Sequence, residues 1–222
     1  MSTEKQDLEY SLRVLMVDVG RWMHQRGYIA GSDGNLSARL GAERLLVTPA
    51  GAPKGDLAPA DLVVTWLDGS PCSRTERPST ELALHVAAYR QRPEIGAIVH
   101  AHPPAVVAHS LVGISLSPAV LPESILNKGG VATVEYRLPG SSLLAEEVAA
   151  ALRENDTVVM ERHGTVTVGS DLASAYRRLE SLEHTAKTLL MARAIGQVEP
   201  LPEREVERLR ELSVKRKAER LS

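Results

Sequence analysis

The sequence predicts a single α/β domain, and three observations support this expectation. A length of 222 residues suits one domain with a full-sized core and is short for two. Apolar residues make up 43% of the chain and charged residues 24%, which is typical of a globular protein. Short β-rich runs alternate with amphipathic helical segments, without an internal repeat or a convincing linker. Because the chain has no Phe and few other aromatic residues, we expect a core of Ala, Leu and Val.

The first half of the chain alternates helical and β-rich segments. Apolar residues recur at helical spacing over residues 7–26, and Gly27 follows them as a stop signal. Residues 27–40 contain three glycines among polar residues, so we expect a loop there. The helices expected in this half cover residues 7–26, 80–90 and 104–112, and the expected strands cover 45–51, 59–69 and 95–102.

The second half continues the alternation and ends in a charged segment. Runs rich in Val and Thr predict strands over residues 131–136, 157–162 and 165–169. Amphipathic helices are expected over residues 141–155 and 171–196. The remaining residues are charged and helix-prone. We therefore expect one domain over residues 1–196, followed by a charged helical tail over residues 197–222.

The composition excludes several classes of protein. The 26 basic and 28 acidic side chains give a net charge of −2, whereas a nucleic-acid-binding protein usually has a basic face. A single cysteine, Cys72, cannot form an internal disulfide and is typical of a reducing compartment. The polar N-terminus lacks a signal-peptide core, and no apolar run approaches the ~20 residues of a membrane span. We expect a cytoplasmic protein without nucleic-acid or membrane partners.

Two histidines one residue apart raise the question of a metal site. His100 and His102 end the expected strand over residues 95–102, where side chains two residues apart point to the same face. His163 follows another β-rich run, and Gly164 permits a sharp turn after it. Three imidazoles suit Zn²⁺ and leave a fourth position for substrate, although the spacing alone also fits histidines without a metal. For the other four histidines, surface or packing roles in helices are the simplest interpretation: His24, His85, His109 and His184.

Three loops have features that suit phosphate. SDGNLS (32–37) and TPAG (48–51) are glycine turns that expose backbone N–H groups. PSTE (78–81) places two hydroxyls at a helix N-terminus, where the amides and the helix dipole favour an anion. Ordinary turns and a helix cap supplied by either hydroxyl are the alternative interpretation. Glu81 is either a proton-transfer carboxylate or a favourable acid in the first turn of the helix.

Five segments occur in the order seen in the class II aldolase/adducin family: GNLSARL, LLVTPAG, RPSTELALHVAAYRQRP, AIVHAHP and ERHGTVTVG. The resemblance covers about residues 10–196, and within the family the chain looks most like the L-fuculose-phosphate aldolases. It implies a three-layer α/β/α fold around a mixed, mainly antiparallel sheet. It also implies a homotetramer with active sites at the subunit interfaces.

The resemblance implies roles for individual residues as well. His100, His102 and His163 would bind Zn²⁺, or another divalent metal such as Mn²⁺ or Co²⁺. Glu81 would be the acid/base residue, able to approach the metal when no substrate is bound. The matching phosphate-binding positions are Gly34, Asn35, Gly51, Ser79 and Thr80. The implied activity is cleavage of a ketose 1-phosphate, such as fuculose 1-phosphate or a related deoxy-pentulose phosphate, to dihydroxyacetone phosphate and an aldehyde.

The aldehyde end of the pocket departs from the aldolase pattern. Glu123 stands where the aldolases have a tyrosine, counted back from Gly129-Gly130. The last tyrosine is Tyr176, so the aldolases' tyrosine near the C-terminus has no counterpart, and Ala50 replaces a hydroxyl residue. A change of substrate is therefore expected at this end.

Glu123 raises a specific alternative, because the related methylthioribulose-1-phosphate dehydratases carry a glutamate in this segment. A protonated Glu123 could supply the acid that expels water, or it could be an interface residue paired with Lys128. Decarboxylase and epimerase relatives offer further chemistries. A non-enzymatic, adducin-like interaction module is the remaining alternative, although adducin head domains lack the full histidine set found here.

Overall fold

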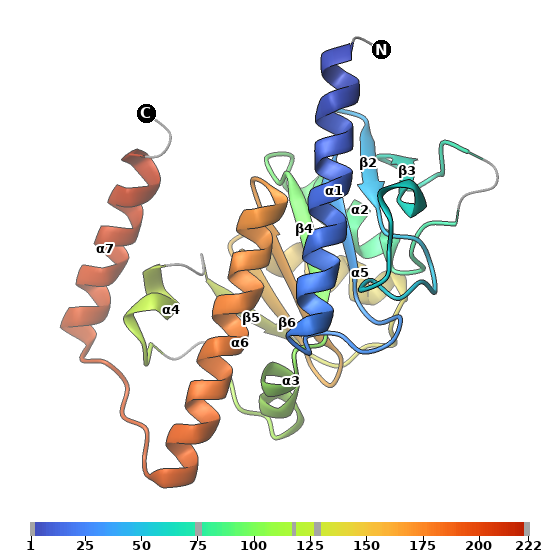
Figure 1. Ribbon diagram of the computed structural model, residues 1–222. Coiled ribbons are helices and arrows are strands. Elements are labelled where there is room, and N and C mark those ends of the chain that lie inside the picture. Colours follow the sequence, from blue (N-terminus) through green and yellow to red (C-terminus); the bar gives the residue numbers. More distant parts are fainter. Residues whose placement is uncertain (1–2, 74–76, 117–118, 127–129, 220–222) are drawn as a thin grey trace.

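A seven-stranded sheet forms the centre of the computed structural model, which describes residues 3–73, 77–116, 119–126 and 130–219 (Figure 1). The strands are β1 (Asn35–Arg39), β2 (Arg44–Val47), β3 (Val63–Trp66), β4 (Ala97–Ala101), β5 (Val131–Val134), β6 (Thr157–Met160) and β7 (Gly164–Gly169). They lie in the order β3-β2-β1-β4-β7-β6-β5. Neighbouring strands are antiparallel, apart from the parallel pair β5 and β6. The expected mixed, mainly antiparallel sheet is confirmed.

Helices cover both faces of the sheet and complete the three layers (Figure 1). They are α1 (Thr3–Gln25), α2 (Leu82–Gln91), α3 (Pro104–Leu111), α4 (Pro122–Leu126), α5 (Ser142–Ala151), α6 (Leu172–Ile195) and α7 (Glu203–Glu219), with a 3-10 turn at Pro59–Asp61. Val99 of β4 packs in the core with α1 and α6, whereas Ile98 packs in the core with α2 and α5. Within the described residues, no helix combines the length and apolar character of a membrane span.

The two central strands β4 and β7 are buried along their whole length. They pair with each other, with Ala101 opposite Thr165, and both lie between the two helical layers. A strand covered on both faces is apolar at successive positions rather than at alternate ones. The apolar run AIV predicted β4, and the alternation of Val and Thr in TVTVG predicted β7.

Residues 27–40 form a loop only in part, which corrects the expectation for this stretch. Asn35–Arg39 make up β1, which pairs with β2 on one side and β4 on the other. Leu36 enters the core beside α1, while Ser37 hydrogen-bonds to side chains of α2. The polar residues are satisfied by partners far away in the sequence, so a segment with a loop-like composition becomes a buried strand.

The start of α2 also differs from the expected cap. Glu81, rather than Ser79 or Thr80, occupies the cap position, and its side chain makes no capping hydrogen bond. The Glu81 N–H donates instead to Ser79 Oγ at 3.3 Å. The Glu81 carboxylate is therefore available for contacts away from its own helix.

The charged segment after α6 forms helix α7, which contacts the short, unexpected helix α4. The Leu201 N–H donates to the Ala119 carbonyl at 2.9 Å, and Val206 is buried. The helical character of this segment was expected. The division of the chain at residues 196 and 197 stays a prediction.

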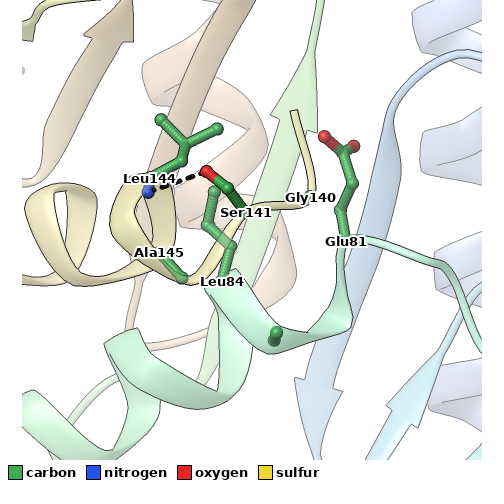
Figure 2. A pocket seen from close by; sticks show the side chains of 7 residues that line it. Glu81, Leu84, Gly140, Ser141, Leu144 and Ala145 are labelled. Carbon is green, nitrogen blue, oxygen red and sulfur yellow. Dashed lines mark hydrogen bonds between the residues drawn. The ribbon is translucent and has the colours of Figure 1, made fainter. Parts of the chain in front are cut away.

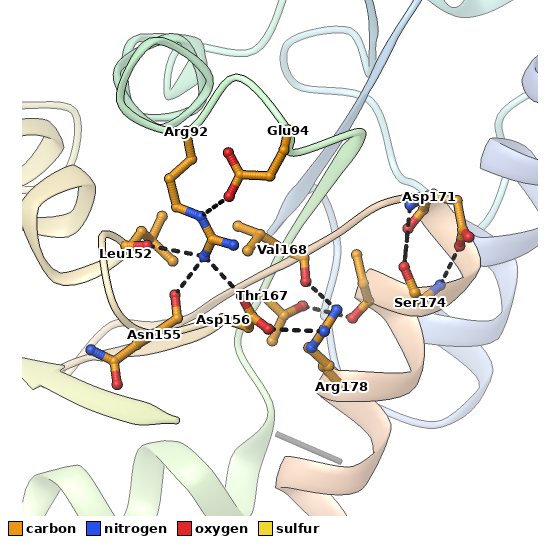
Figure 3. A network of polar contacts seen from close by, with 11 residues as sticks. Arg92, Glu94, Leu152, Asn155, Asp156, Thr167, Val168, Asp171, Ser174 and Arg178 are labelled. Carbon is orange, nitrogen blue, oxygen red and sulfur yellow. Dashed lines mark hydrogen bonds and ion pairs between the residues drawn. The ribbon is translucent and has the colours of Figure 1, made fainter. Parts of the chain in front are cut away.

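A half-buried ion-pair network joins the two helical layers around the edge of β6 (Figure 3). Asp156 accepts from Arg92 Nη1 at 2.7 Å and from Arg178 Nη2 at 2.9 Å. Arg92 follows α2 and also donates to the Leu152 carbonyl, whereas Arg178 lies on α6 and donates to the Val168 carbonyl. One carboxylate thus ties together helices on opposite faces of the sheet.

Candidate metal and catalytic site

Three histidines meet at the ends of the central strands. His100 lies on β4, His102 directly follows this strand, and His163 lies in the turn between β6 and β7. Because β7 pairs with β4, this turn reaches the end of β4. One ring nitrogen from each histidine lies within 4.8 Å of the others, and His100 Nε2 is 3.1 Å from His102 Nε2. The structure brings together the three side chains that the sequence singled out.

Glu81 completes the cluster from the start of α2. Its Oε2 lies 3.1 Å from His100 Nε2, and its Oε1 lies 3.4 Å from His163 Nε2. In a tetrahedral zinc site with bonds of about 2.1 Å, neighbouring ligand atoms are about 3.4 Å apart. The contacts of His100 Nε2 with His102 and Glu81, at 3.1 Å, and of Glu81 with His163, at 3.4 Å, are close to this spacing. The donor set of three imidazoles and one carboxylate therefore fits a divalent cation.

Partners on the opposite ring nitrogens orient two of the imidazoles. His100 Nδ1 lies 3.0 Å from the Thr165 carbonyl and donates to it, which leaves the Nε2 lone pair directed at the cluster. His102 Nδ1 faces the Asp33 carboxylate at 3.5 Å. Such outer partners are typical of metal-ligating histidines, because they fix the ring orientation and raise ligand basicity.

Burial sets the charge states of the cluster. It lowers the pKa of His102 to about 4, with the neighbouring histidines acting in the same direction, and it also lowers the pKa of His163. Both rings are therefore neutral near pH 7 and have lone pairs for a cation. For Glu81, burial raises the pKa, but the contacts of its carboxylate with His100, and to a smaller extent with His163 and Asn35, outweigh burial and lower the pKa to about 2. Glu81 is a carboxylate at neutral pH.

A strained turn presents His163. Arg162 has a φ of 59°, which is uncommon for a residue other than glycine. Its N–H donates to Ser110 Oγ of α3 at 3.0 Å, so a partner from another element holds the turn. A Cβ atom on Gly164 would meet the Ala101 carbonyl and would approach His102 Cδ2 to 2.7 Å. Glycine at this position allows the turn to pass directly against the neighbouring histidine.

Two of the three expected phosphate loops lie against each other. Pro49 and Pro78 form an isolated bridge, and the Ser79 N–H donates to the Thr48 carbonyl at 3.2 Å. Gly51 has a φ of 69°, and Thr80 is exposed beside this pair of loops. The Ser79 N–H is thus engaged between the loops, whereas Thr80 is exposed, and the phosphate-binding role of these residues stays a prediction.

The third loop leads into β1 beside the histidines. Gly34 has a φ of 66°, and a Cβ atom there would lie 2.6 Å from the His100 carbonyl oxygen. Asn35 is buried opposite His100 in the sheet. Its Nδ2 donates to Glu81 Oε2 at 2.9 Å, so this side chain contacts the candidate acid/base residue directly.

A small pocket lies beside Glu81, between the starts of α2 and α5 (Figure 2). Its wall includes Leu84 of α2 and the turn before α5. Gly140 has a φ of 78° there, and Ser141 caps α5 by accepting from the Leu144 N–H at 3.2 Å. One side of Glu81 thus faces the histidines, while the other borders an apolar wall.

The sequence analysis missed several residues that support the site. Lys54 is 3% exposed, and its Nζ donates to the Ser32 carbonyl at 2.5 Å, which anchors the loop that carries Asp33. Burial lowers the pKa of Lys54, while the carboxylates of Asp33 and Glu81 act in the opposite direction. A lysine within GAPKGD, directly after a glycine turn, was the available signal. Nothing local in the sequence pointed to Ser110.

Glu123 is not brought to the cluster within this chain. It is exposed on α4, and among the described residues no hydrogen bond or ion pair joins it to the histidines. Its suggested partner Lys128 and the neighbouring Gly129 lie outside the described residues. The catalytic role of Glu123 therefore stays a hypothesis.

The other four histidines lie outside the cluster. His24 and His184 are exposed on α1 and α6. His85 and His109 are buried on α2 and α3, and each has a hydrogen-bond partner at Nδ1. Surface and packing roles agree with these positions.

Comparisons with known proteins agree with this geometry. The sequence model of the Class II Aldolase and Adducin N-terminal domain matches residues 14–190. A 3-oxo-tetronate 4-phosphate decarboxylase from Haemophilus influenzae is 37% identical over 178 residues, which cover 78% of this chain and 84% of that protein. An L-fuculose phosphate aldolase from Methanocaldococcus jannaschii is 34% identical over 181 residues, which cover 79% of this chain and 93% of that protein. The crystal structure of Escherichia coli YgbL, described as an aldolase, epimerase or decarboxylase, matches with a TM-score of 0.85 at 33% identity, covering 91% of this chain and 99% of that one.

Proposed function

Because the chain belongs to the class II aldolase and adducin family, we propose that it is a zinc-dependent carbon–carbon lyase that decarboxylates a phosphorylated 3-oxo acid of the 3-oxo-tetronate 4-phosphate type. The observation that carries this proposal is the contact of the Glu81 carboxylate with His100 and His163, which puts a proton-transfer group at three clustered imidazoles. The chain is 37% identical to a decarboxylase, and this similarity favours a reaction in which carbon dioxide is the leaving group.

Decarboxylation and aldol cleavage of such phosphates share one intermediate. In a 3-oxo-tetronate 4-phosphate, loss of carbon dioxide breaks the C1–C2 bond, and its electron pair forms an enediolate across C2 and C3. Protonation at C2 then gives dihydroxyacetone phosphate. Cleavage of a ketose 1-phosphate between C3 and C4 yields the same enediolate together with an aldehyde. A site that stabilises and protonates this enediolate serves either reaction.

Residues of this chain supply the groups that the reaction needs. His100, His102 and His163 would hold the cation, and their imidazole donors are the basis for proposing Zn²⁺. When bound, the cation would supply Lewis acidity that stabilises negative charge on a substrate oxygen. Glu81 takes up a proton from solvent and delivers it to the enediolate carbon, which supplies the one proton that decarboxylation consumes, while Asn35 holds the carboxylate in place.

The loops beside the cluster would grip the phosphate. Backbone N–H groups at Gly34 and Gly51 and the hydroxyls of Ser79 and Thr80 are the proposed donors. Asn35 would contribute through its backbone, because its side-chain amide is engaged with Glu81. Phosphate contacts that stabilise the bound substrate and the transition state equally contribute to binding alone. Their removal should therefore raise KM more than it lowers kcat.

Aldol cleavage of a ketose 1-phosphate is the second candidate, supported by the likeness to the archaeal aldolase. The departing aldehyde forms only when its hydroxyl loses a proton, so this reaction needs a second proton-transfer group. Glu123 stands at the aldolases' tyrosine position but is exposed on α4, without a bond to the cluster among the described residues. Decarboxylation needs no such group, because carbon dioxide leaves without proton transfer. This difference favours decarboxylation.

We also propose that the protein assembles as a homotetramer with its sites between subunits. Exposed apolar side chains at the end of α3 and on the last turns of α6 are available for such contacts: Leu111, Val112, Leu190, Met191 and Ile195. Light scattering after size-exclusion chromatography tests this, since a monomer would contradict the proposed assembly.

Product analysis by phosphorus and carbon NMR tests the proposed reaction. Zinc-loaded protein would be given 3-oxo-tetronate 4-phosphate, L-fuculose 1-phosphate and methylthioribulose 1-phosphate in parallel, with Glu81→Gln as the control. We expect dihydroxyacetone phosphate and carbon dioxide from the first substrate, and far less from the variant. Dihydroxyacetone phosphate with an aldehyde from the second substrate alone would establish aldol cleavage instead. A dehydrated diketo phosphate from the third would identify a dehydratase and give Glu123 the role of leaving-group acid.

A further inference from the structure

A ladder of polar side chains joins β1 to α2 and ends at Glu81. Its strand residues project from one face of β1 at every second position: Asn35, Ser37 and Arg39. Its helix residues follow at intervals of four: Glu81, His85 and Tyr89. Strand residues two apart are separated by about 6.6 Å and helix residues four apart by about 6 Å, so the two rows stay in register.

Short hydrogen bonds connect the two rows. Asn35 Nδ2 donates to Glu81 Oε2 at 2.9 Å. Ser37 Oγ lies 2.6 Å from His85 Nδ1 and 2.9 Å from the Tyr89 hydroxyl. Ser37, His85 and Tyr89 are at most 2% exposed, so these contacts lie in the interior, where a polar network is stable only when its members are paired.

The groups around Tyr89 indicate which atoms donate in these hydrogen bonds. The Arg39 guanidinium lies 4.8 Å from the centre of the Tyr89 ring, which makes the phenol a better donor, and burial raises the pKa of Tyr89 so that it keeps its proton. This favours Tyr89 as the donor to Ser37, and in that arrangement Ser37 donates to His85 Nδ1. Burial lowers the pKa of His85 to about 3, so the ring is neutral and in this arrangement carries its single proton on Nε2.

Two atoms at the other end of the ladder are complementary. Among the described residues, neither His85 Nε2 nor Asn35 Oδ1 has a hydrogen-bond partner, and both are buried. The Asn35 amide nitrogen is used on Glu81, so its oxygen is the free acceptor, while His85 Nε2–H is the free donor. The two atoms are not hydrogen-bonded to each other in the structure, so their pairing is part of the inference. A buried donor or acceptor left unpaired costs about 1–3 kcal/mol, which is the reason to expect the pairing.

We propose that Tyr89, Ser37 and His85 form a polarised hydrogen-bond chain that fixes the Asn35 carboxamide and, through it, the orientation of the Glu81 carboxylate. His85 and Tyr89 are thus positioning residues for proton transfer. This inference rests on the proposed function only for the role of Glu81. The direction of the hydrogen bonds from Tyr89 to His85 can be measured without any reaction.

Proton exchange of dihydroxyacetone phosphate in deuterated water tests the effect on Glu81, because the shared product exchanges its carbon-bound proton through the enediolate. Tyr89→Phe removes one hydroxyl from the chain. We expect exchange at saturating substrate to slow about 10-fold, the equivalent of one hydrogen bond, with KM and zinc content unchanged. Tyr176→Phe is the control, since Tyr176 is also a buried tyrosine and its hydroxyl has no partner among the described residues. An exchange rate within twofold of wild type in Tyr89→Phe would overturn the proposal.

A pair of variants at His85 separates positioning from packing. His85→Leu fills the space without a donor, whereas His85→Gln restores an N–H near the Nε2 position. We expect exchange to recover at least threefold in His85→Gln relative to His85→Leu at equal zinc content. Equal rates in the two variants would show that His85 serves packing alone.

The tautomer of His85, measured by nitrogen NMR of the zinc-loaded protein, is the readout independent of catalysis. We expect the proton on Nε2 in the wild type, with a shift toward Nδ1 in Tyr89→Phe. A wild-type proton on Nδ1 would overturn the proposed hydrogen-bond chain. If the wild type catalyses no exchange at all, the proposed function fails. The tautomer of His85 alone then supports or overturns the hydrogen-bond chain.

Discussion

A methyl group at position 164 has no room, and this makes Gly164→Ala a direct test of how the histidines are held together. The new Cβ would lie 2.7 Å from His102 Cδ2, whereas non-bonded carbons prefer about 3.5–4.0 Å. The same Cβ would also meet the Ala101 carbonyl oxygen, so β7 must separate from β4 and the His102 ring must move by about 1 Å. Overpacking of this kind costs about 1–3 kcal/mol of unfolding free energy. Ligand distances tolerate only about 0.2 Å, so we expect zinc affinity to fall about 10–100-fold.

Competition with a zinc chelator measures this affinity, and urea unfolding measures the stability. Gly196→Ala is the matched control, because a Cβ there meets nothing within 4 Å and the residue lies beyond α6. We expect the control to bind zinc like the wild type. Wild-type zinc affinity in folded Gly164→Ala would refute the inference that the close approach at this glycine sets the position of His102.

Three further outcomes follow from the same structure. Glu81→Gln should lower turnover about 10²–10⁴-fold while KM stays nearly constant, and steady-state kinetics with wild-type turnover would contradict its proton-transfer role. Asp156→Asn removes the carboxylate from Arg178 and leaves Arg92 with only the Glu94 carboxylate, so it should cost about 2 kcal/mol in urea unfolding with zinc affinity unchanged. A loss below about 0.5 kcal/mol would contradict a stabilising role for this half-buried network. The zinc-free protein should be fully stabilised by His85 and His102 above about pH 6.5 and should lose this stability as the pH falls toward 4, because the unfolded chain then binds more protons than the folded one. Thermal unfolding across this range checks the sign, and a midpoint that rises on acidification would contradict it.

Much of the fold and of the metal cluster could be predicted because the signals are local. β4 is buried on both faces and begins with a continuous apolar run, and β7 is rich in the β-formers Val and Thr, so both were recognisable as strands. The spacing of His100 and His102 placed both side chains at one strand end, and the structure confirms that they converge. Recognition of His163 as the third member depended on the family resemblance as well as on its position after a β-rich run.

The parts that could not be predicted depend on contacts between distant segments. β1 has a loop-like composition, and its buried polar residues are satisfied by α2, which lies 46 or more residues away in the sequence. The bond from Asn35 to Glu81 exists only because the sheet places β1 beside the start of α2. The requirement for glycine at position 164 likewise depends on how closely the turn approaches His102, a distance that the sequence does not contain.

Titration of zinc into chelator-treated protein, with turnover of 3-oxo-tetronate 4-phosphate followed at each addition, tests the central claim most directly. We expect turnover to rise in proportion to bound zinc and to saturate at about one zinc per chain, the capacity of one three-histidine site. Saturation should require His100, His102 and His163 together, so that loss of any one lowers both bound zinc and turnover. Turnover that is independent of zinc, or protein that binds one zinc per chain at this site and releases no carbon dioxide, would contradict the assignment.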